Sequence, residues 1–385
     1  MTSTRNWTPA IILALLAAWA VTFAALVMER KDQIHVSGHA VSGSDRVYHW
    51  KMVTTWPKNT PGVGVSAEKL AVIINEMSNG RLKIHVHGAG ELVPAMGVFE
   101  AVSAGSVEMG HAASYYWRGK TASAGFFTSM PFGMNVAEQN AWLFYGGGME
   151  LWREVYEPFN LVPFAAGNTG VQMAGWFRNP VNSLKDITGL KMRVSGIAGE
   201  VFSMVGGTAV NIPGGDVYYS LKSGVVDAAD WIAPENDLAF GFHQIAKYYY
   251  YPGWQEPAPT LELMVNKTAF EKLPEDLQAI VTYAARVINQ DMYDSYTAHN
   301  ARALKELKEK GVEVRRLPDE VLEKLYEMSF KAYDEQAARD PQFKKVYESY
   351  MKFLDEVSPY QEISEQTYYR VRESLREKEA LPSPQ

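Results

Sequence analysis

A few charged side chains stand inside apolar or aromatic stretches, where burial without a partner would be costly. Arg193 lies within the run LKMRV, and Asp230 and Trp231 end the run VVDAADW. Glu256 lies in the aromatic, proline-rich stretch YYYYPGWQEPAP. A guanidinium group matches a carboxylate in bidentate geometry, and a carboxylate beside a large ring suits the floor of a site. The pattern indicates a carboxylate-binding site, although Arg193 could equally be an exposed strand residue and the aromatic residues could cover a core edge.

The sequence lacks the motifs of several common enzyme classes. No HExxH, Walker A, GxSxG or strand–helix GxGxxG motif is present. The absence of cysteine excludes disulfides, zinc ribbons, iron–sulfur clusters and thiol nucleophiles. Of the eight histidines, only His85 and His87 are expected to share a strand face, and their charged neighbours favour solvent over a metal site. The net charge of −7 implies no basic patch, so no nucleic acid partner is expected.

The elements that must position these residues follow a β-α-β-α-β order. Alternating apolar residues predict strands near 48–53, 82–87 and 106–111. Helices are predicted between them, one capped by Ser66 and closed by Asn79-Gly80, and one near 96–104. This order favours a parallel sheet with helices on its faces. Ligands of open α/β sheets bind outside the carboxyl ends of the strands, which is where Asp230 is expected.

The same pattern recurs further along the chain. Strands are predicted at 190–194, 208–212 and 225–231, and helices at 196–205 and 218–223. The junction GSVEMG at 105–110 corresponds to GVVDAA at 224–229. Two such halves predict two similar lobes.

The rest of the chain is predicted to be helical. A helix over 137–156 is interrupted by three consecutive glycines at 146–148. From Phe270 onward the sequence is helical and highly charged, with aromatic residues that indicate amphipathic helices. Their charged faces could be solvated, or one helix could lie on a partner subunit. The final LPSPQ is expected to be frayed.

The N-terminus indicates export. Pro9 to Met28 contain no charged residue, and Arg5 precedes them. At about 1.5 Å per residue this run spans about 30 Å, the thickness of a bilayer core. We expect residues 1–32 to be a cleaved signal peptide or a retained membrane anchor, and residues 33–46 to be a spacer. Both alternatives place the folded body outside the cytoplasm.

An ordered set of longer strings makes a family resemblance specific. The sequence resembles the substrate-binding subunits of TRAP (tripartite ATP-independent periplasmic) transporters, and most closely the branch that binds 2-oxo monocarboxylates such as pyruvate, with lactate-binding relatives nearby. The resemblance covers about Val47 to Asp340. It is carried by WPKNTPGVG (56–64), AASYYW (112–117), GGGMELW (146–152), GNTGVQMAGWF (167–177), LKDITGLKMRV (184–194), DAADWIAPEND (227–237), YYPGWQEP (250–257) and NKTAFEKLPEDLQ (266–278).

The resemblance implies an α/β fold of two lobes with crossing connections, which close on a ligand between them. Residues 47–165 would form the first lobe, with a return segment near 255–300. Residues 166–254 would form the second lobe, with helices near 300–340. Residues 341–385 would form a long C-terminal helical extension, which some relatives exchange in a homodimer. The extension could equally fold back on its own chain.

The resemblance also implies a set of ligand-binding residues. Arg193 would bind the substrate carboxylate, and Tyr116 and Asn168 would contact the substrate oxygens. A cation would bridge protein and substrate, held by Gln172, Asp230, the backbone carbonyl of Trp231, and Glu256. A set made only of oxygens suits a hard cation, Na⁺ or Ca²⁺. One difference is Asp230, where the resemblance leads us to expect glutamate; it leaves open the cation and the choice between 2-oxo and 2-hydroxy acids.

The function expected from the resemblance is that of a periplasmic receptor, not an enzyme. The receptor would bind a 2-oxo or 2-hydroxy monocarboxylate with a cation and deliver it to a TRAP membrane permease. Two other functions are weighed against it. One is an exported cation-dependent hydrolase or lyase that uses Asp230 and Glu256, although no nucleophile or general base is recognisable. The other is a membrane-anchored sensory or scaffold domain.

Overall fold

The computed structural model describes residues 46–379. The predicted signal peptide or anchor at 1–32, almost all of the predicted spacer and the predicted frayed end lie outside the described residues. No helix within 46–379 is long and apolar enough to cross a membrane.

The first sheet has five strands, in the order β2-β1-β3-β10-β4. The predicted parallel order is correct for β1, β2 and β3. The sheet as a whole is mixed, because β10 returns from the second lobe and runs antiparallel to both β3 and β4. The strands are β1 (Tyr48–Thr54), β2 (Leu82–His87), β3 (Met109–Ala112), β4 (Leu161–Asn168) and β10 (Thr260–Asn266).

The helices of the first lobe lie close to their predicted places, with one corrected boundary. Ser66 lies inside its helix, because the helix starts at Val63 with Gly62 as its N-cap. Gly62 has φ +67°, and a Cβ there would lie 2.1 Å from the Tyr296 ring, so glycine is required. These helices are α2 (Val63–Met77), α3 (Val98–Ser103), α4 (Gly125–Thr128), α5 (Val136–Tyr145), α6 (Gly148–Tyr156) and α10 (Lys267–Glu271).

The second sheet has six strands, in the order β11-β9-β5-β8-β6-β7. The parallel neighbours β7, β6 and β8 are those predicted by the repeat, although each is shorter than expected. The strands are β5 (Gly175–Phe177), β6 (Lys191–Arg193), β7 (Thr208–Val210), β8 (Ala228–Ala229), β9 (Tyr248–Tyr251) and β11 (Glu313–Arg316). The helices between them are α7 (Gly196–Met204), α8 (Val217–Ser223) and α9 (Pro234–Phe240).

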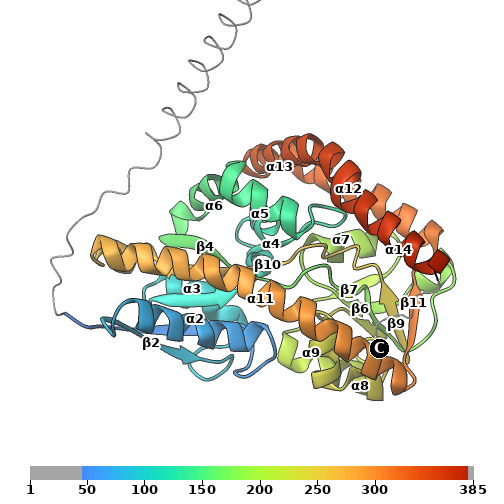
Figure 1. The fold of residues 1–385 in the computed structure, drawn as a ribbon, viewed down its shortest axis with the longest axis horizontal. Helices are drawn as coiled ribbons and strands as arrows, with labels where there is room; N and C mark the ends of the chain where they lie inside the picture. Colours follow the sequence, from blue (N-terminus) through green and yellow to red (C-terminus); the bar gives the residue numbers. More distant parts are fainter. Residues whose placement is uncertain (1–45, 380–385) are drawn as a thin grey trace, which may run out of the picture. The chain divides into compact units, whose positions relative to one another are not determined.

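Three connections join the two lobes. Residues 169–174 lead from β4 of the first sheet to β5 of the second, and residues 252–259 lead back from β9 to β10. The third connection is α11 (Glu275–Glu309), which runs along both lobes in Figure 1. Its first half packs in the core beneath the first sheet, whereas Met292, Tyr296 and Leu307 pack with residues of the second. The predicted two-lobed α/β architecture with crossing connections is confirmed.

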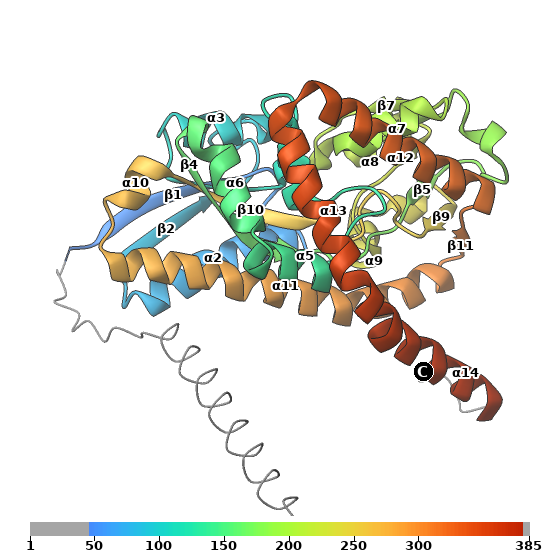
Figure 2. The ribbon, with the colours of Figure 1, turned by 90° about the horizontal axis from the view of Figure 1, so that it is seen from above.

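The C-terminal extension consists of a packed helix followed by an exposed one. In α13 (Pro341–Gln361), the side chains of Phe343, Val346 and Tyr350 are buried in the core. Tyr350 also accepts a hydrogen bond from the Met134 amide at 2.6 Å. After a π-helical turn (Glu362–Gln366), α14 (Thr367–Glu379) extends away from the body in Figure 2. The helix before the extension is α12 (Asp319–Arg339), which packs on α7.

Candidate functional site

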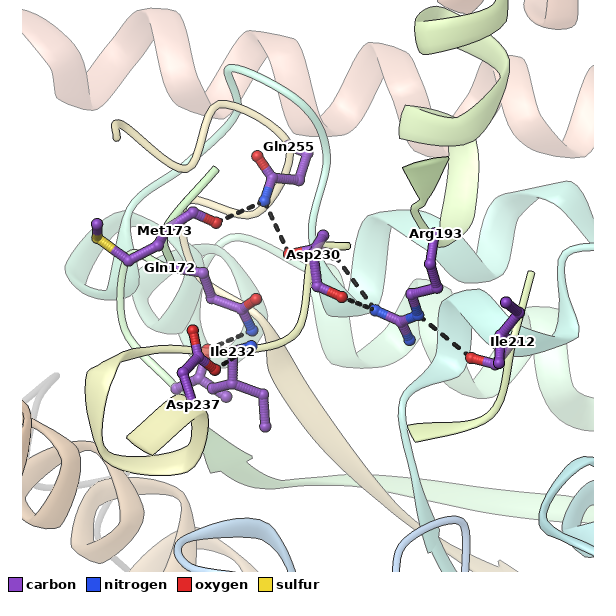
Figure 3. Close-up of polar contacts among 9 residues, drawn as sticks. Gln172, Met173, Arg193, Ile212, Asp230, Ile232, Asp237 and Gln255 are labelled. Atoms are coloured by element: carbon purple, nitrogen blue, oxygen red, sulfur yellow. Dashed lines mark hydrogen bonds and ion pairs between the residues drawn. The ribbon is translucent and has the colours of Figure 1, made fainter. Parts of the chain in front are cut away.

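The predicted site residues come together from the second sheet and from the two crossing segments. β6 and β8 are parallel neighbours, and Arg193 is paired with Ala229. Asp230, the next residue, donates its amide hydrogen to the Arg193 carbonyl at 3.0 Å. Gln172 lies in the first crossing segment and Glu256 in the second, and the Gln172 amide donates to the Glu256 carbonyl at 3.1 Å. The structure thus brings four residues from distant parts of the sequence to one place, and Figure 3 shows three of them, Gln172, Arg193 and Asp230.

Arg193 is buried, so the alternative of an exposed strand residue is wrong. Only 1% of its surface is exposed. Nη1 donates to the Asp230 carbonyl at 2.7 Å and lies 3.4 Å from Asp230 Oδ2, while Nε donates to the Ile212 carbonyl at 3.2 Å. The guanidinium carbon also lies 5.5 Å from the centre of the Trp231 ring. Nη2 has no hydrogen-bond partner among the described residues, so its two N–H groups are available to an anionic ligand.

Asp230 and Glu256 place two carboxylates beside this one arginine. Burial raises the pKa of Asp230 to about 6, against the opposing effects of Arg193 and of a hydrogen bond from Gln255. Burial, followed by the charge of Asp230, raises the pKa of Glu256 well above its usual range. Desolvation lowers the pKa of Arg193, but Tyr116 and the acidic neighbours outweigh it and the net shift is upward. When both carboxylates are ionised, the group carries an excess negative charge that a cation would neutralise.

Two buried oxygens of the predicted cation site are unpaired within the described part of the chain. These atoms are Oε1 of Gln172 and Oε2 of Glu256. Buried polar atoms normally have a partner, so the unpaired oxygens fit a ligand that accepts electron pairs. No group of three or more His, Cys, Asp or Glu side chains within residues 46–379 could hold a metal ion. The predicted cation ligands are not a cluster of this kind. Only Asp230 and Glu256 would bind through carboxylates, whereas Gln172 would bind through its amide oxygen and Trp231 through its backbone carbonyl.

The first lobe contributes aromatic side chains to the site. Tyr116 lies in a short 3₁₀ helix (Ser114–Trp117) directly after β3. Burial raises its pKa, and the nearby Arg193 opposes that shift. Tyr115 was not predicted, yet it is buried, and its hydroxyl interacts with Glu256. The doublet YY, which follows the strand predicted at 106–111, is the signal that could have identified it.

Asn168 is buried, but its side chain bonds within the protein. Its amide nitrogen donates to the Ala258 carbonyl at 3.2 Å and to Thr260 Oγ1 at 3.1 Å. Its oxygen accepts from the Gly170 amide at 2.9 Å. These bonds hold the end of β4 against the second crossing segment, and contact of Asn168 with a substrate stays a prediction.

Both lobes line a small cavity at the site. Its volume is about 20 Å³, room for little more than one water molecule. One part of its wall is polar and includes Thr169 and Gln172, and the rest is mainly apolar or aromatic, from Trp56, Val63, Ala113, Tyr115, Tyr116, Trp231, Ile232, Pro259 and Leu261. The buried indole nitrogens of Trp56 and Trp231 have no partner in the described chain. Trp56 is a second residue that the sequence analysis did not select.

The chain is similar to known solute-binding proteins. The family model described as DctP, bacterial extracellular solute-binding protein, family 7, matches residues 52–340. A monocarboxylate 2-oxoacid-binding periplasmic protein of Nostoc sp. is 41% identical over 319 residues, which cover 83% of this chain and 87% of the relative.

Two solved structures extend the comparison. A TRAP periplasmic solute-binding protein from Pseudoalteromonas atlantica, with bound sodium and pyruvate, is 41% identical with a TM-score of 0.82, covering 84% of this chain and 99% of that one. A TRAP transporter solute-binding protein from Bordetella bronchiseptica is 36% identical with a TM-score of 0.85. The match covers 87% of this chain and 99% of the Bordetella chain. The Bordetella protein is described as a mixed-occupancy dimer with copurified calcium and picolinate.

Proposed function

We propose that this receptor binds pyruvate together with a sodium or calcium ion. The chain belongs to family 7 of the bacterial extracellular solute-binding proteins. It is therefore a substrate-binding receptor of a TRAP transporter and not an enzyme. The observation that supports this ligand is the buried Arg193, which keeps Nη2 unpaired and feels the charges of two buried carboxylates, Asp230 and Glu256. An arginine alone would suffice to bind the carboxylate of a substrate. The two acidic side chains next to this arginine, however, would repel that carboxylate. A bound cation removes that conflict.

We propose a distinct role for each residue of the set. Arg193 binds the substrate carboxylate, and Tyr116 and Asn168 lie near its oxygens. Gln172, Asp230, Glu256 and the carbonyl of Trp231 would hold the cation. The ion would neutralise the acidic pair and coordinate the carboxylate and the 2-oxo or 2-hydroxy oxygen of the substrate together.

The size of the cavity favours a short acid. With a volume of about 20 Å³ and walls that include Trp56, Val63 and Leu261, it must expand even for pyruvate. A longer alkyl chain would have to displace these buried side chains, which costs packing energy. We therefore expect affinity to fall from pyruvate to 2-oxobutyrate and to longer acids.

Calorimetric titration tests the ligand. Purified receptor is titrated with pyruvate, 2-oxobutyrate, lactate and succinate in sodium, in calcium, and after chelation in a sodium-free buffer. Pyruvate should bind tightly only when a cation is present. Binding of a dicarboxylate without a cation would contradict the bridging ion, and no binding of any acid would contradict the ligand class.

The variant Arg193→Ala tests the proposed role of the arginine. The substrate carboxylate would then be buried without its charge partner, so we expect pyruvate binding to disappear while the protein stays folded. Arg178→Ala is the matched control, because Arg178 is an exposed arginine of the same lobe. Affinity close to that of the wild type in Arg193→Ala would contradict the assignment.

We propose that the receptor works in the periplasm, delivers its substrate to a TRAP permease and forms a homodimer through α14. The family description as extracellular supports the location, as does the N-terminal sequence pattern.

The proposed dimer rests on apolar side chains of α14 that are each at least half exposed, namely Tyr368, Tyr369, Val371 and Leu375. A second copy of the chain is the partner we infer for them, because the Bordetella relative is described as a dimer.

A further inference from the structure

Gln255 is a buried residue that lies between the predicted cation ligands without being one of them. It belongs to the second crossing segment, and only 1% of its surface is exposed. Its amide nitrogen donates to Asp230 Oδ1 at 2.9 Å and to the Met173 carbonyl at 2.8 Å. Figure 3 shows the amide nitrogen directed at both acceptors and the amide oxygen turned away from them.

These two hydrogen bonds join the three chain segments that carry the predicted ligands. Met173 follows Gln172 in the first crossing segment, Asp230 follows β8, and Gln255 itself precedes Glu256. Backbone hydrogen bonds reinforce the arrangement, since the Met173 amide also donates to the Ile232 carbonyl at 3.3 Å. The side chain of Gln255 therefore holds the ligand-bearing segments at fixed distances from one another.

The hydrogen bond from Gln255 also fixes the orientation of the Asp230 carboxylate. One oxygen of Asp230 lies 3.4 Å from Arg193 Nη1, and the other accepts from Gln255. Without Gln255, the carboxylate would be free to turn and form a bidentate pair with the guanidinium group, which is the favoured geometry of such a pair. That pair would occupy Nη2, the donor proposed for the substrate, and would withdraw Asp230 from the cation.

The amide oxygen of Gln255 indicates that this residue is not selected for stability alone. The oxygen is buried and has no hydrogen-bond partner in the described residues. A buried unpaired acceptor costs free energy, whereas an apolar side chain of similar size would avoid that cost. The contribution of Gln255 must then lie in what its nitrogen holds in place.

We propose that Gln255 is the positioning residue of the cation site: it orients Asp230 toward the cation, keeps Arg193 Nη2 free for the substrate, and does not coordinate the ion itself. This inference rests on the proposed function.

The test compares Gln255→Met with the wild type in the purified full-length receptor. Methionine has a similar volume and no hydrogen-bond donor. The calcium affinity is measured by calorimetry without any acid, and the pyruvate affinity at saturating calcium. We expect both affinities to fall at least about tenfold, the usual effect of removing a partner that orients a ligand. The melting temperature without cation should change little. Gln244→Met, an exposed glutamine of the same lobe, is the control.

A terbium probe distinguishes positioning from general damage. Tb³⁺ is a hard cation, and its luminescence lifetimes in H₂O and D₂O report how many water molecules it binds. If Asp230 turns away from the ion in Gln255→Met, about one more water should bind to Tb³⁺. A purely structural role would leave this number unchanged.

Each outcome has a separate meaning. Calcium affinity and Tb³⁺ hydration equal to those of the wild type would overturn the role of Gln255. If Gln255→Met does not fold, Gln255→Asn replaces it, because the shorter amide cannot reach both acceptors, and wild-type affinity there would also overturn the role. If the wild type itself binds neither sodium nor calcium, the proposed function fails before the role of Gln255 is in question.

Discussion

Several carboxylates are buried in this protein, and not all of them belong to the proposed ligand site. Glu262 in β10 is completely buried in the first lobe, where it accepts hydrogen bonds from Trp117 Nε1 and, at 2.7 Å, from the Tyr156 hydroxyl. Burial raises the pKa of Glu262 to about 7, although both hydrogen bonds oppose the shift. Glu262 therefore couples folding to pH, independently of ligand.

The stability of the receptor should fall as pH rises toward 7 because of Glu262. The folded state holds the proton up to about pH 7, whereas the unfolded state releases it near 4.5, so the free energy of unfolding decreases between these values. The loss is roughly 3 kcal/mol. Glu262→Gln should remove this decrease. Denaturation of the wild type and the variant at pH 5 and pH 8 measures the change in the free energy of unfolding between the two pH values. A variant with the wild-type pH slope contradicts the expectation, and Glu76→Gln, at an exposed position, is the control.

Gly253 shows how closely the crossing segments approach each other. A Cβ at this position would lie 2.2 Å from the Gln172 carbonyl oxygen. Gly253→Ala should separate the two segments, lower the free energy of unfolding by about 1–3 kcal/mol and weaken pyruvate binding. Gly119→Ala is the matched control, because a Cβ there has no neighbour within 4 Å. Equal pyruvate affinity in the two variants would show that the contact is unimportant.

Among the elements, the two parts of the C-terminal extension have different roles. The side chains that α13 buries contact Phe126 and Trp142 of the first lobe, whereas α14 exposes its apolar side chains. A chain that ends at Gln361 should keep the stability of the full receptor but lose the proposed dimer. A chain that ends at Asp340 should be much less stable, because it lacks all of α13.

Light scattering and thermal melting on both truncated chains check this expectation. An unchanged ratio of measured mass to chain mass after removal of residues 362–385 would exclude a dimer through α14. Equal melting temperatures for the two truncations would show that the packing of α13 contributes little.

Much of the fold could be predicted from sequence because its strands and helices follow regular periods. Five strands were not predicted: β4, β5, β9, β10 and β11. In β11 (Glu313–Arg316) three of the four side chains are charged, so the strand has no alternating apolar pattern. Ser66 was taken as a cap because its residue type suits one, whereas the N-cap is Gly62, a position that admits only glycine because the ring of Tyr296, far away in the sequence, packs against it. The lobe boundaries by residue number stay a prediction.

The site was predictable only in part, for a related reason. The sequence surroundings selected Arg193 and Glu256, and the family resemblance added Gln172; the structure brings the three together, whereas periodicity alone could not tell whether Arg193 is buried. Tyr115 and Gln255 lie in the same family strings as Tyr116 and Glu256, but the resemblance assigned a ligand role only to Tyr116 and Glu256. Which member of a doublet faces a ligand and which supports it depends on backbone direction in irregular segments, and a sequence does not specify that direction.

For the whole molecule, closure of the two lobes can be followed at one ion pair. Arg118 lies in the first lobe just after the 3₁₀ helix that carries Tyr116, and it pairs with Glu200 of α7 in the second lobe. Arg339 Nη2 lies 3.9 Å from the same carboxylate. The pair stands beside a hollow of about 690 Å³ that is also lined by Tyr115 and Tyr116. The pair therefore spans the cleft next to the proposed site.

Loss of this ion pair should weaken ligand binding slightly by making closure less favourable. Both side chains are partly exposed, so we expect Glu200→Gln to raise the Kd for pyruvate about two- to fivefold, less at high salt. Glu91→Gln is the control, because Glu91 pairs with Lys58 within the first lobe at 3.2 Å. Equal effects of the two substitutions on Kd would argue against a role in closure.

Two of the residues proposed to hold the ligand, and the residue proposed to position them, lie on the segments that join the two lobes. Gln172, Gln255 and Glu256 are all in residues 169–174 and 252–259, the passages between the sheets. Ligand binding and closure of the lobes therefore depend on the same residues, so a substitution cannot change one without affecting the other. A mutation that accommodates a new substrate also changes the angle at which the receptor closes and the ease with which it releases its cargo. Engineering of a pyruvate sensor from this scaffold should accordingly select for affinity and for response amplitude together.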